Sequence, residues 1–162
     1  MGVDQEVGSA GAGAELFFEV VDSGVTRMPT DAEVLTLHRY YIWANKFRTH
    51  FDRILGSAET LDPNPRVWFF DKAGLFLSYW YAALYVVIEG WLELGLQDEE
   101  IDALLASPNV DHLRRYRNGV CHFQSKYFDE RFVELMASPG SAEWVRSLNY
   151  ELGRFFLQRP HS

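Results

Sequence analysis

Residues 66–94 read RVWFFDKAGLFLSYWYAALYVVIEGWLEL, and this stretch decides the fold class. Large apolar side chains fall on every turn, so a helix over this range is apolar nearly all round. Such a helix either lies at the centre of a protein or crosses a membrane. The part without a charge, residues 73–88, is only sixteen residues long, whereas a membrane span takes about 20. We therefore predict a buried core helix, which ends at Gly95.

Helical patterns continue on both sides of this stretch, with apolar residues mostly three or four positions apart. Thr30 and Glu33 have the spacing of a capping box, which predicts a helix that begins there and ends at Gly56. Further helices are expected over residues 98–106, 110–136 and 141–157. No segment has the alternation of a strand, and no repeat is found. The sequence therefore predicts an all-α fold, an up-and-down helical bundle of four long helices plus short helices.

The two parts of the chain differ in composition. Residues 1–14 are rich in Gly and Ala and have no periodicity, so we expect a disordered N-terminal tail. Residues 15–162 have the size of a single helical domain, which opens with a short helical segment at residues 15–21. The N-terminus lacks the basic start of a signal peptide. Cys121 is the only cysteine, so an internal disulfide is excluded and a reducing, cytoplasmic location is expected.

Charge is distributed unevenly along the chain. The sequence has 15 basic and 23 acidic residues, and this net charge of −8 argues against a general nucleic-acid coat protein. The segment 111–131 departs from this balance, with five basic and three acidic side chains. Its basic residues are Arg114, Arg115, Arg117, Lys126 and Arg131. Positive charge is thus concentrated in one segment, which is compatible with a local basic site.

The same segment contains an Arg–His spacing that carries chemistry. Arg117 is followed at once by Asn118 and, after four intervening residues, by His122. This pattern resembles the motif of HEPN domains, an all-helical superfamily with many ribonucleases, in which four to six residues separate an Arg from a His. A polar residue often follows that Arg. Residues 30–157 are similar to the family in architecture as well, with a long apolar helix ahead of the motif.

The resemblance implies a metal-independent endoribonuclease without a cofactor. His122 would act as the general base that activates the ribose 2′-OH, which attacks the adjacent phosphate. Arg117 would bind that phosphate and stabilise the transition state, and Asn118 would orient the phosphate or the imidazole. The products would be a 2′,3′-cyclic phosphate and a 5′-OH. The residues that bind the RNA would be Arg114, Arg115 and Lys126.

The resemblance also implies partners. Family members usually pair two subunits so that both motifs face one cleft, and we expect a homodimer that buries the helix 110–136 against its mate. RNA would be the substrate. An antitoxin or regulatory protein would be a further partner in a toxin–antitoxin or defence system, and no membrane is expected. Gln124 stands where one toxin branch of the family has Tyr, so membership of that branch is not implied.

On a regular helix the motif residues do not share one face. Arg117 and His122 are five residues apart, hence about 140° apart, whereas Arg115 and His122 lie within about 20°. Arg115 is therefore an alternative to Arg117 as the phosphate ligand. The predicted polar stripe contains Arg115, Asn118, His122, Lys126 and Asp129. The predicted apolar face contains Leu113, Tyr116, Val120, Phe123 and Tyr127.

Other hypotheses stay open beside the ribonuclease. Net charge favours either an inactive HEPN-like module that binds RNA or a partner protein, or a helical scaffold without an RNA role. Arg117 has an alternative partner in Glu89, the acid that interrupts the apolar helix and needs a charge partner if it is buried. His122 has the alternative of an ordinary surface histidine.

Overall fold

The computed structural model describes residues 27–57, 64, 67 and 71–158. The predicted tail over residues 1–14 and the short segment 15–21 lie outside the described residues. The helices in chain order are α1 (Asp31–Gly56), α3 (Lys72–Glu93), α4 (Glu99–Leu105), α5 (Asn109–Cys121), α6 (Glu130–Ala137) and α7 (Ser141–Gln158). The described part of the chain contains no strand, so the predicted all-α helical bundle is confirmed.

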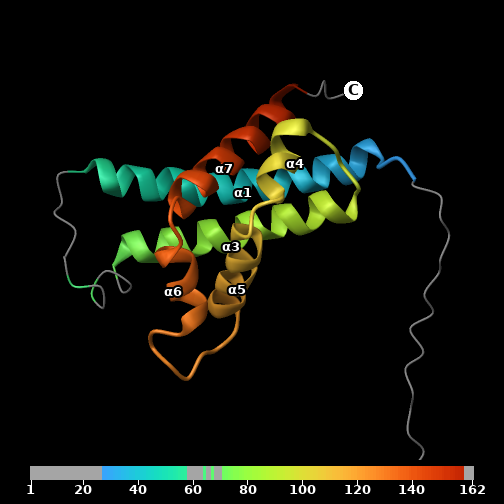
Figure 1. Cartoon of the computed structure of the whole chain (residues 1–162). Coiled ribbons are helices and arrows are strands. Elements are labelled where there is room, and N and C mark those ends of the chain that lie inside the picture. Colours follow the sequence, from blue (N-terminus) through green and yellow to red (C-terminus); the bar gives the residue numbers. More distant parts are fainter. Residues whose placement is uncertain (1–26, 58–63, 65–66, 68–70, 159–162) are drawn as a thin grey trace, which may run out of the picture.

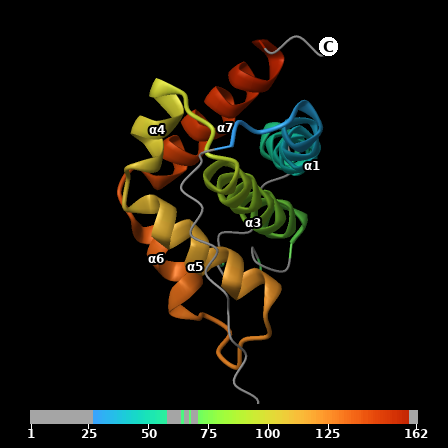
Figure 2. The ribbon, with the colours of Figure 1, turned by 90° about the vertical axis from the view of Figure 1, so that its right-hand side faces the viewer.

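Two long helices form the frame of the bundle. α1 and α3 lie side by side and run antiparallel, and α7 crosses α1 (Figure 1). The shorter helices α4, α5 and α6 lie on one side of the α1–α3 pair (Figure 2). α5 packs on α3, and α6 folds back against α5. The motif segment therefore lies at the far end of the molecule from the crossing of α1 and α7 (Figure 1).

Local signals set the ends of both long helices. The backbone N–H of Glu33 donates to the Thr30 hydroxyl at 3.3 Å, and the Thr30 N–H donates to the Glu33 carboxylate at 2.8 Å. This is the predicted capping box at the start of α1. The Asp71 carboxylate accepts from the first N–H of α3, and Gly95 follows that helix with a φ of 59°. A left-handed residue of this kind suits glycine, and the predicted stop is confirmed.

α3 is the central helix of the core, as its apolar sequence predicts. Trp80, Leu84, Val87, Ile88 and Trp91 are each at most 1% exposed. α1 covers one side of this helix and α5 another. By length and composition, with a mean hydropathy of 1.3, α3 would suffice to cross a membrane. Half of that stretch is buried inside the bundle, and the core helix of a soluble protein has the same properties.

The prediction of one helix over residues 110–136 is wrong, because this range forms α5, a loop and α6. The backbone of His122 is extended, with φ −125° and ψ 139°. α6 returns along α5 so that the Phe132 ring packs where Gly119 has no side chain, and Leu135 becomes fully buried. A straight helix would leave these apolar residues without that contact. The single helix over residues 110–136, which we expected to be buried in a homodimer, therefore does not exist.

Candidate functional site

Helix α5 holds the motif residues and is fixed to α3 by its apolar face. Leu113 and Tyr116 are fully buried, as predicted for this face. The Tyr116 hydroxyl is 3.0 Å from the Ser78 hydroxyl, and its ring meets the Tyr81 ring edge-on. Burial raises the pKa of Tyr116 to about 12, so this phenol stays neutral and serves the packing. The contacts fix the rotation of α5 and so the directions of its polar residues.

Arg117 binds the acid that the sequence offered as its alternative partner. Its Nη2 lies 2.9 Å and 3.3 Å from the two carboxylate oxygens of Glu89 on α3. Its Nη1 donates to Asn118 Oδ1 at 3.0 Å, and its guanidinium lies 5.8 Å from the centre of the Tyr85 ring. The Glu89 side chain is 42% exposed and the Arg117 side chain 27%. The Glu89–Arg117 pair therefore exists, but it lies at the surface and Glu89 is not a buried acid.

His122 lies at the C-terminal end of α5 and is exposed. Gln124 Nε2 donates to the His122 carbonyl at 2.7 Å, which fixes the chain as it leaves the helix. The imidazole itself makes no hydrogen bond, ion pair or ring contact with the described residues. A shallow cavity of about 340 Å³ opens beside it and is also lined by Lys126 and Tyr127. His122 is thus free to exchange a proton with a ligand at this surface.

The three predicted RNA contacts differ in how available their charges are. Arg114 is bonded to Asp111 through two N–H groups at 2.6 Å and 3.0 Å. Arg115 forms an ion pair with Glu134 on α6 at 2.7 Å. Lys126 is exposed in the loop and has no partner in the described part of the chain. Neighbouring acids therefore neutralise most of the positive charge of this segment, and Lys126 is the basic residue that stays open.

The loop between α5 and α6 also changes the predicted faces. Lys126 and Asp129 do not lie on α5, so the predicted polar stripe ends at His122. Phe123 is 95% exposed and Tyr127 is 47% exposed, so neither belongs to the apolar face. The prediction placed them in the core because their spacing continues the pattern of α5. Instead, aromatic side chains surround the cavity beside the free imidazole.

The structure brings the motif residues only partly together. The cavity lined by His122 contains neither Arg117 nor Asn118, and it contains neither of the two preceding arginines. Arg117 points toward α3, and Arg115 toward α6. Among the described residues, no group of three or more His, Cys, Asp or Glu side chains could hold a metal ion. One chain therefore presents an exposed base and, apart from it, two guanidiniums: that of Arg117, which Glu89 on α3 holds, and that of Arg115, which Glu134 on α6 holds.

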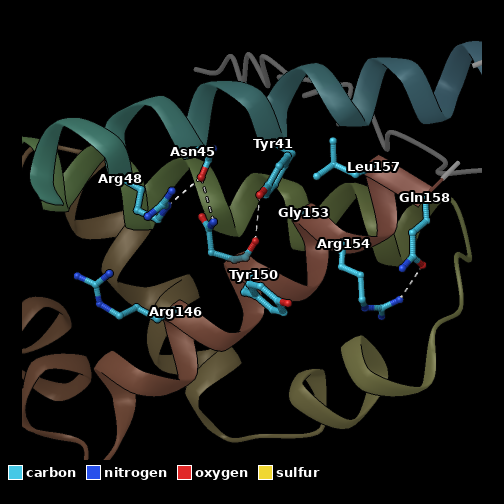
Figure 3. Close-up of a pocket in the computed structure, with 10 residues that line it drawn as sticks. Tyr41, Asn45, Arg48, Arg146, Tyr150, Gly153, Arg154, Leu157 and Gln158 are labelled. Carbon is cyan, nitrogen blue, oxygen red and sulfur yellow. Dashed lines mark hydrogen bonds between the residues drawn. The ribbon is translucent and has the colours of Figure 1, made fainter. Parts of the chain in front are cut away.

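A groove between α1 and α7 was not predicted from the sequence. It gathers Arg48 from α1 with Arg146 and Arg154 from α7 around one space (Figure 3). The only sequence signal is the four-residue spacing of Arg146, Tyr150 and Arg154, which places the three on one side of α7. The α1 side chains that complete the groove lie about a hundred positions earlier, and no local pattern joins the two segments.

No family model matches the chain, and no match was found among the curated proteins or the solved structures. Two features of the α5 region bear on function: the free imidazole of His122, and the arginines of α5, each of which is paired with an acid.

Proposed function

We propose that this chain is a metal-independent endoribonuclease of the HEPN type that acts on RNA in the cytoplasm. The observation that carries the proposal is the unpartnered imidazole of His122 at the open end of α5, five residues after Arg117. A general base must reach the proton that it abstracts, and an exposed histidine beside a cavity has that access to a ribose 2′-OH.

The motif residues have distinct roles in the proposed reaction. His122 takes the proton of the 2′-OH, whose oxygen forms a bond to the adjacent phosphorus. The bond from phosphorus to the 5′ oxygen breaks, and the products are a 2′,3′-cyclic phosphate and a 5′-OH. Arg117 stabilises the charge on the phosphate oxygens with the N–H groups that Glu89 and Asn118 leave open. Asn118 is a positioning residue, because its side chain holds that guanidinium.

A second copy of the chain completes the site in this proposal. One imidazole cannot accept the 2′-OH proton and donate a proton to the leaving 5′ oxygen at the same moment, and a second copy of His122 supplies the acid. Pairing also unites a base and a guanidinium that one chain holds apart. Light scattering at micromolar concentration should show a dimer. A protein that is entirely monomeric would remove the second acid–base group and contradict this assembly.

An inactive HEPN-like module that binds RNA or a protein is the second candidate, for instance the partner of an antitoxin in a toxin–antitoxin or defence system. The ion pairs favour it, since Arg114, Arg115 and Arg117 already hold acids. The exposed rings of Phe123 and Tyr127 suit contact with a base or with an apolar protein surface. This candidate needs no convergence of His122 and Arg117.

Incubation of the purified protein with labelled RNA in EDTA separates the two candidates. The ribonuclease should cut and leave cyclic phosphate ends without a metal ion. DNA, or an RNA that is 2′-O-methylated at the cut site, should resist, because each lacks the attacking 2′-OH. RNA that is bound but never cut would favour an RNA-binding module, and RNA that is neither bound nor cut would leave a protein-binding module or a helical scaffold.

A further inference from the structure

The groove between α1 and α7 has a volume of about 570 Å³, in the range of pockets that hold small organic ligands. Its lining consists of Tyr41, Asn45, Arg48, Arg146, Asn149, Tyr150, Gly153, Arg154, Leu157 and Gln158. Three of these residues are arginines and none is an acid, although the chain carries a net charge of −8. This lining favours an anionic ligand.

One carboxylate holds two of the arginines as a pair. Arg48 Nη1 lies 2.6 Å from Asp52 Oδ2, and Arg146 Nη2 lies 2.8 Å from Asp52 Oδ1. The Arg146 guanidinium also lies 5.5 Å from the centre of the Trp80 ring. Asp52 and Trp80 are not part of the groove lining. Two positive charges thus share one negative charge, and both guanidiniums are held in place before a ligand arrives.

The third arginine lies in a different electrostatic setting. Arg154 bonds to Glu151 on its own helix and to Asp98 at 2.6 Å. Its Nη1 also donates to Gln158 Oε1 at 3.3 Å. Two acids therefore more than balance the charge of Arg154. The excess of positive charge lies at the Arg48–Arg146 end of the groove, and a phosphate is expected there.

Two amides add hydrogen-bond donors to the lining. Asn45 Oδ1 accepts from Arg48 Nε at 2.8 Å and from Asn149 Nδ2 at 3.2 Å, while Gln158 Oε1 accepts from Arg154. The oxygens of both amides are therefore occupied. Their nitrogens have no partner in the described part of the chain. Phosphate oxygens only accept hydrogen bonds, so the free groups of this lining match them.

Tyr150 supplies a flat surface in the middle of the groove. Its side chain is 70% exposed, and its ring lies between Arg146 and Arg154 (Figure 3). These three residues are four positions apart on α7, hence about 6 Å from one to the next. Leu157, which is 83% exposed, extends the apolar surface toward the end of the helix. A nucleobase can stack on an exposed ring of this kind.

We propose that this groove binds a nucleotide, with its phosphates on the Arg48–Arg146 pair and its base stacked on Tyr150. The phosphates meet guanidiniums that already have fixed positions and the free amide of Asn45. The base meets the aromatic and apolar part of the lining. The proposal concerns binding alone and does not depend on RNA cleavage at α5.

Titration calorimetry of the full chain in metal-free buffer tests the proposal with ATP and with pyrophosphate. Both probes should bind, and ATP more tightly because it also carries a base. Arg146→Gln should weaken the binding of both by about tenfold or more, the size expected for a charge-assisted hydrogen bond. Arg53→Gln is the matched control, since Arg53 is an exposed arginine of α1 outside the groove. It should leave both titrations unchanged.

Two further variants separate the phosphate subsite from the base subsite. Asn45→Asp keeps the shape and the accepting oxygen but places a negative charge in the lining, so both probes should bind at least tenfold more weakly. Tyr150→Ala removes an exposed ring, and it should weaken ATP several-fold while pyrophosphate binds as before. Circular dichroism should show unchanged helix content in every variant.

Three outcomes would overturn the proposal. One is that neither probe binds at millimolar concentration. Another is that Arg146→Gln and Asn45→Asp both leave binding intact, which would place the ligand elsewhere. A third is that a single-stranded RNA binds at these residues while ATP does not, which would make the groove a nucleic-acid surface.

Discussion

The α5 end and the α1–α7 groove both contain arginines, but the two regions hold them differently. At α5, the arginines of the motif segment pair with acids, and His122 lines a separate cavity without them. In the groove, Arg48, Arg146 and Arg154 also pair with acids, but side chains from α1 and α7 line one space together (Figure 3). A motif marks chemistry along the sequence, whereas a binding site needs side chains from several helices to open onto one space.

The largest effect should come from His122, on the motif side of this comparison. If the imidazole is the general base, His122→Ala should lower RNA cleavage by a factor on the order of 10²–10⁴ while the fold stays intact. Initial cleavage rates in EDTA, together with a thermal melt, measure both properties. The side chain is exposed and unpartnered, so its loss removes no packing.

His50→Ala is the matched control, because His50 is an exposed histidine on α1, far along the chain from the motif. Its cleavage rate should equal that of the wild type. Equal cleavage by wild type and His122→Ala would show that the motif does not carry the activity. The catalytic base would then lie in another part of the chain.

The next largest effect should be on stability, from a buried side chain in the wall of the groove. Asn149 is 3% exposed; its Oδ1 accepts from the Trp80 indole N–H at 2.9 Å, and its Nδ2 donates to Asn45. Asn149→Leu leaves the buried indole N–H unpaired, and the free energy of unfolding should fall by about 1–3 kcal/mol. Urea denaturation measures the change, with Tyr150→Ala as an exposed neighbour that should stay near the wild type. An unchanged midpoint in Asn149→Leu would show that water replaces the lost bond.

Two glycines compare the packing of the two regions directly. A Cβ at Gly153 would lie 2.4 Å from the Tyr41 hydroxyl, and Tyr41 is fixed by its bond to the Asn149 carbonyl. A Cβ at Gly119 would lie 3.0 Å from the edge of the Phe132 ring. We expect Gly153→Ala to destabilise by about 1–3 kcal/mol, since the core must shift.

Gly119→Ala should cost less, because its contact is the longer of the two and Phe132 is only partly buried. The same urea series measures both variants. A larger cost at Gly119 than at Gly153 would reverse the comparison. It would show that the contact of α6 with α5 is the tighter of the two.

Local signals in the sequence predict much of the fold, but they predict the two sites less well. The capping box at Thr30 and the apolar run of α3 are local, so the sequence predicts both helices. The break after Cys121 is not local. The spacing of Phe123 and Tyr127 continues the helical pattern, and the reason for the break is the packing of Phe132 against Gly119 together with the burial of Leu135.

The groove is harder still to predict from the sequence, because its lining joins residues 41–48 with residues 146–158. The ion pairs also differ in how far the sequence predicts them. The sequence offers Glu89 as a partner for Arg117 because it is the one acid among the apolar residues 73–92, whereas Glu134 as the partner of Arg115 depends on the return of α6. An ion pair such as Arg115–Glu134 can be predicted only when the path of the chain is known.

The smallest effect concerns the Glu89–Arg117 pair, and it sharpens the meaning of that contact. A buried acid would lose several kcal/mol on losing its partner, but the Glu89 side chain is 42% exposed and water screens the pair. Glu89→Gln should therefore lower the free energy of unfolding by only about 0.2–1 kcal/mol, and salt at about 1 M should abolish the difference. Urea denaturation at low and high salt checks this, with Glu93→Gln as a matched exposed acid of the same helix. A loss of about 3 kcal/mol or more would mean that the pair is buried in solution, as it would be inside a dimer.

RNA cleavage by the same variant tests the functional role of the pair. Glu89→Gln removes the ionic contact that positions Arg117 and leaves its contacts with Asn118 and the Tyr85 ring, so RNA cleavage should fall if that guanidinium binds the scissile phosphate, even though stability barely changes.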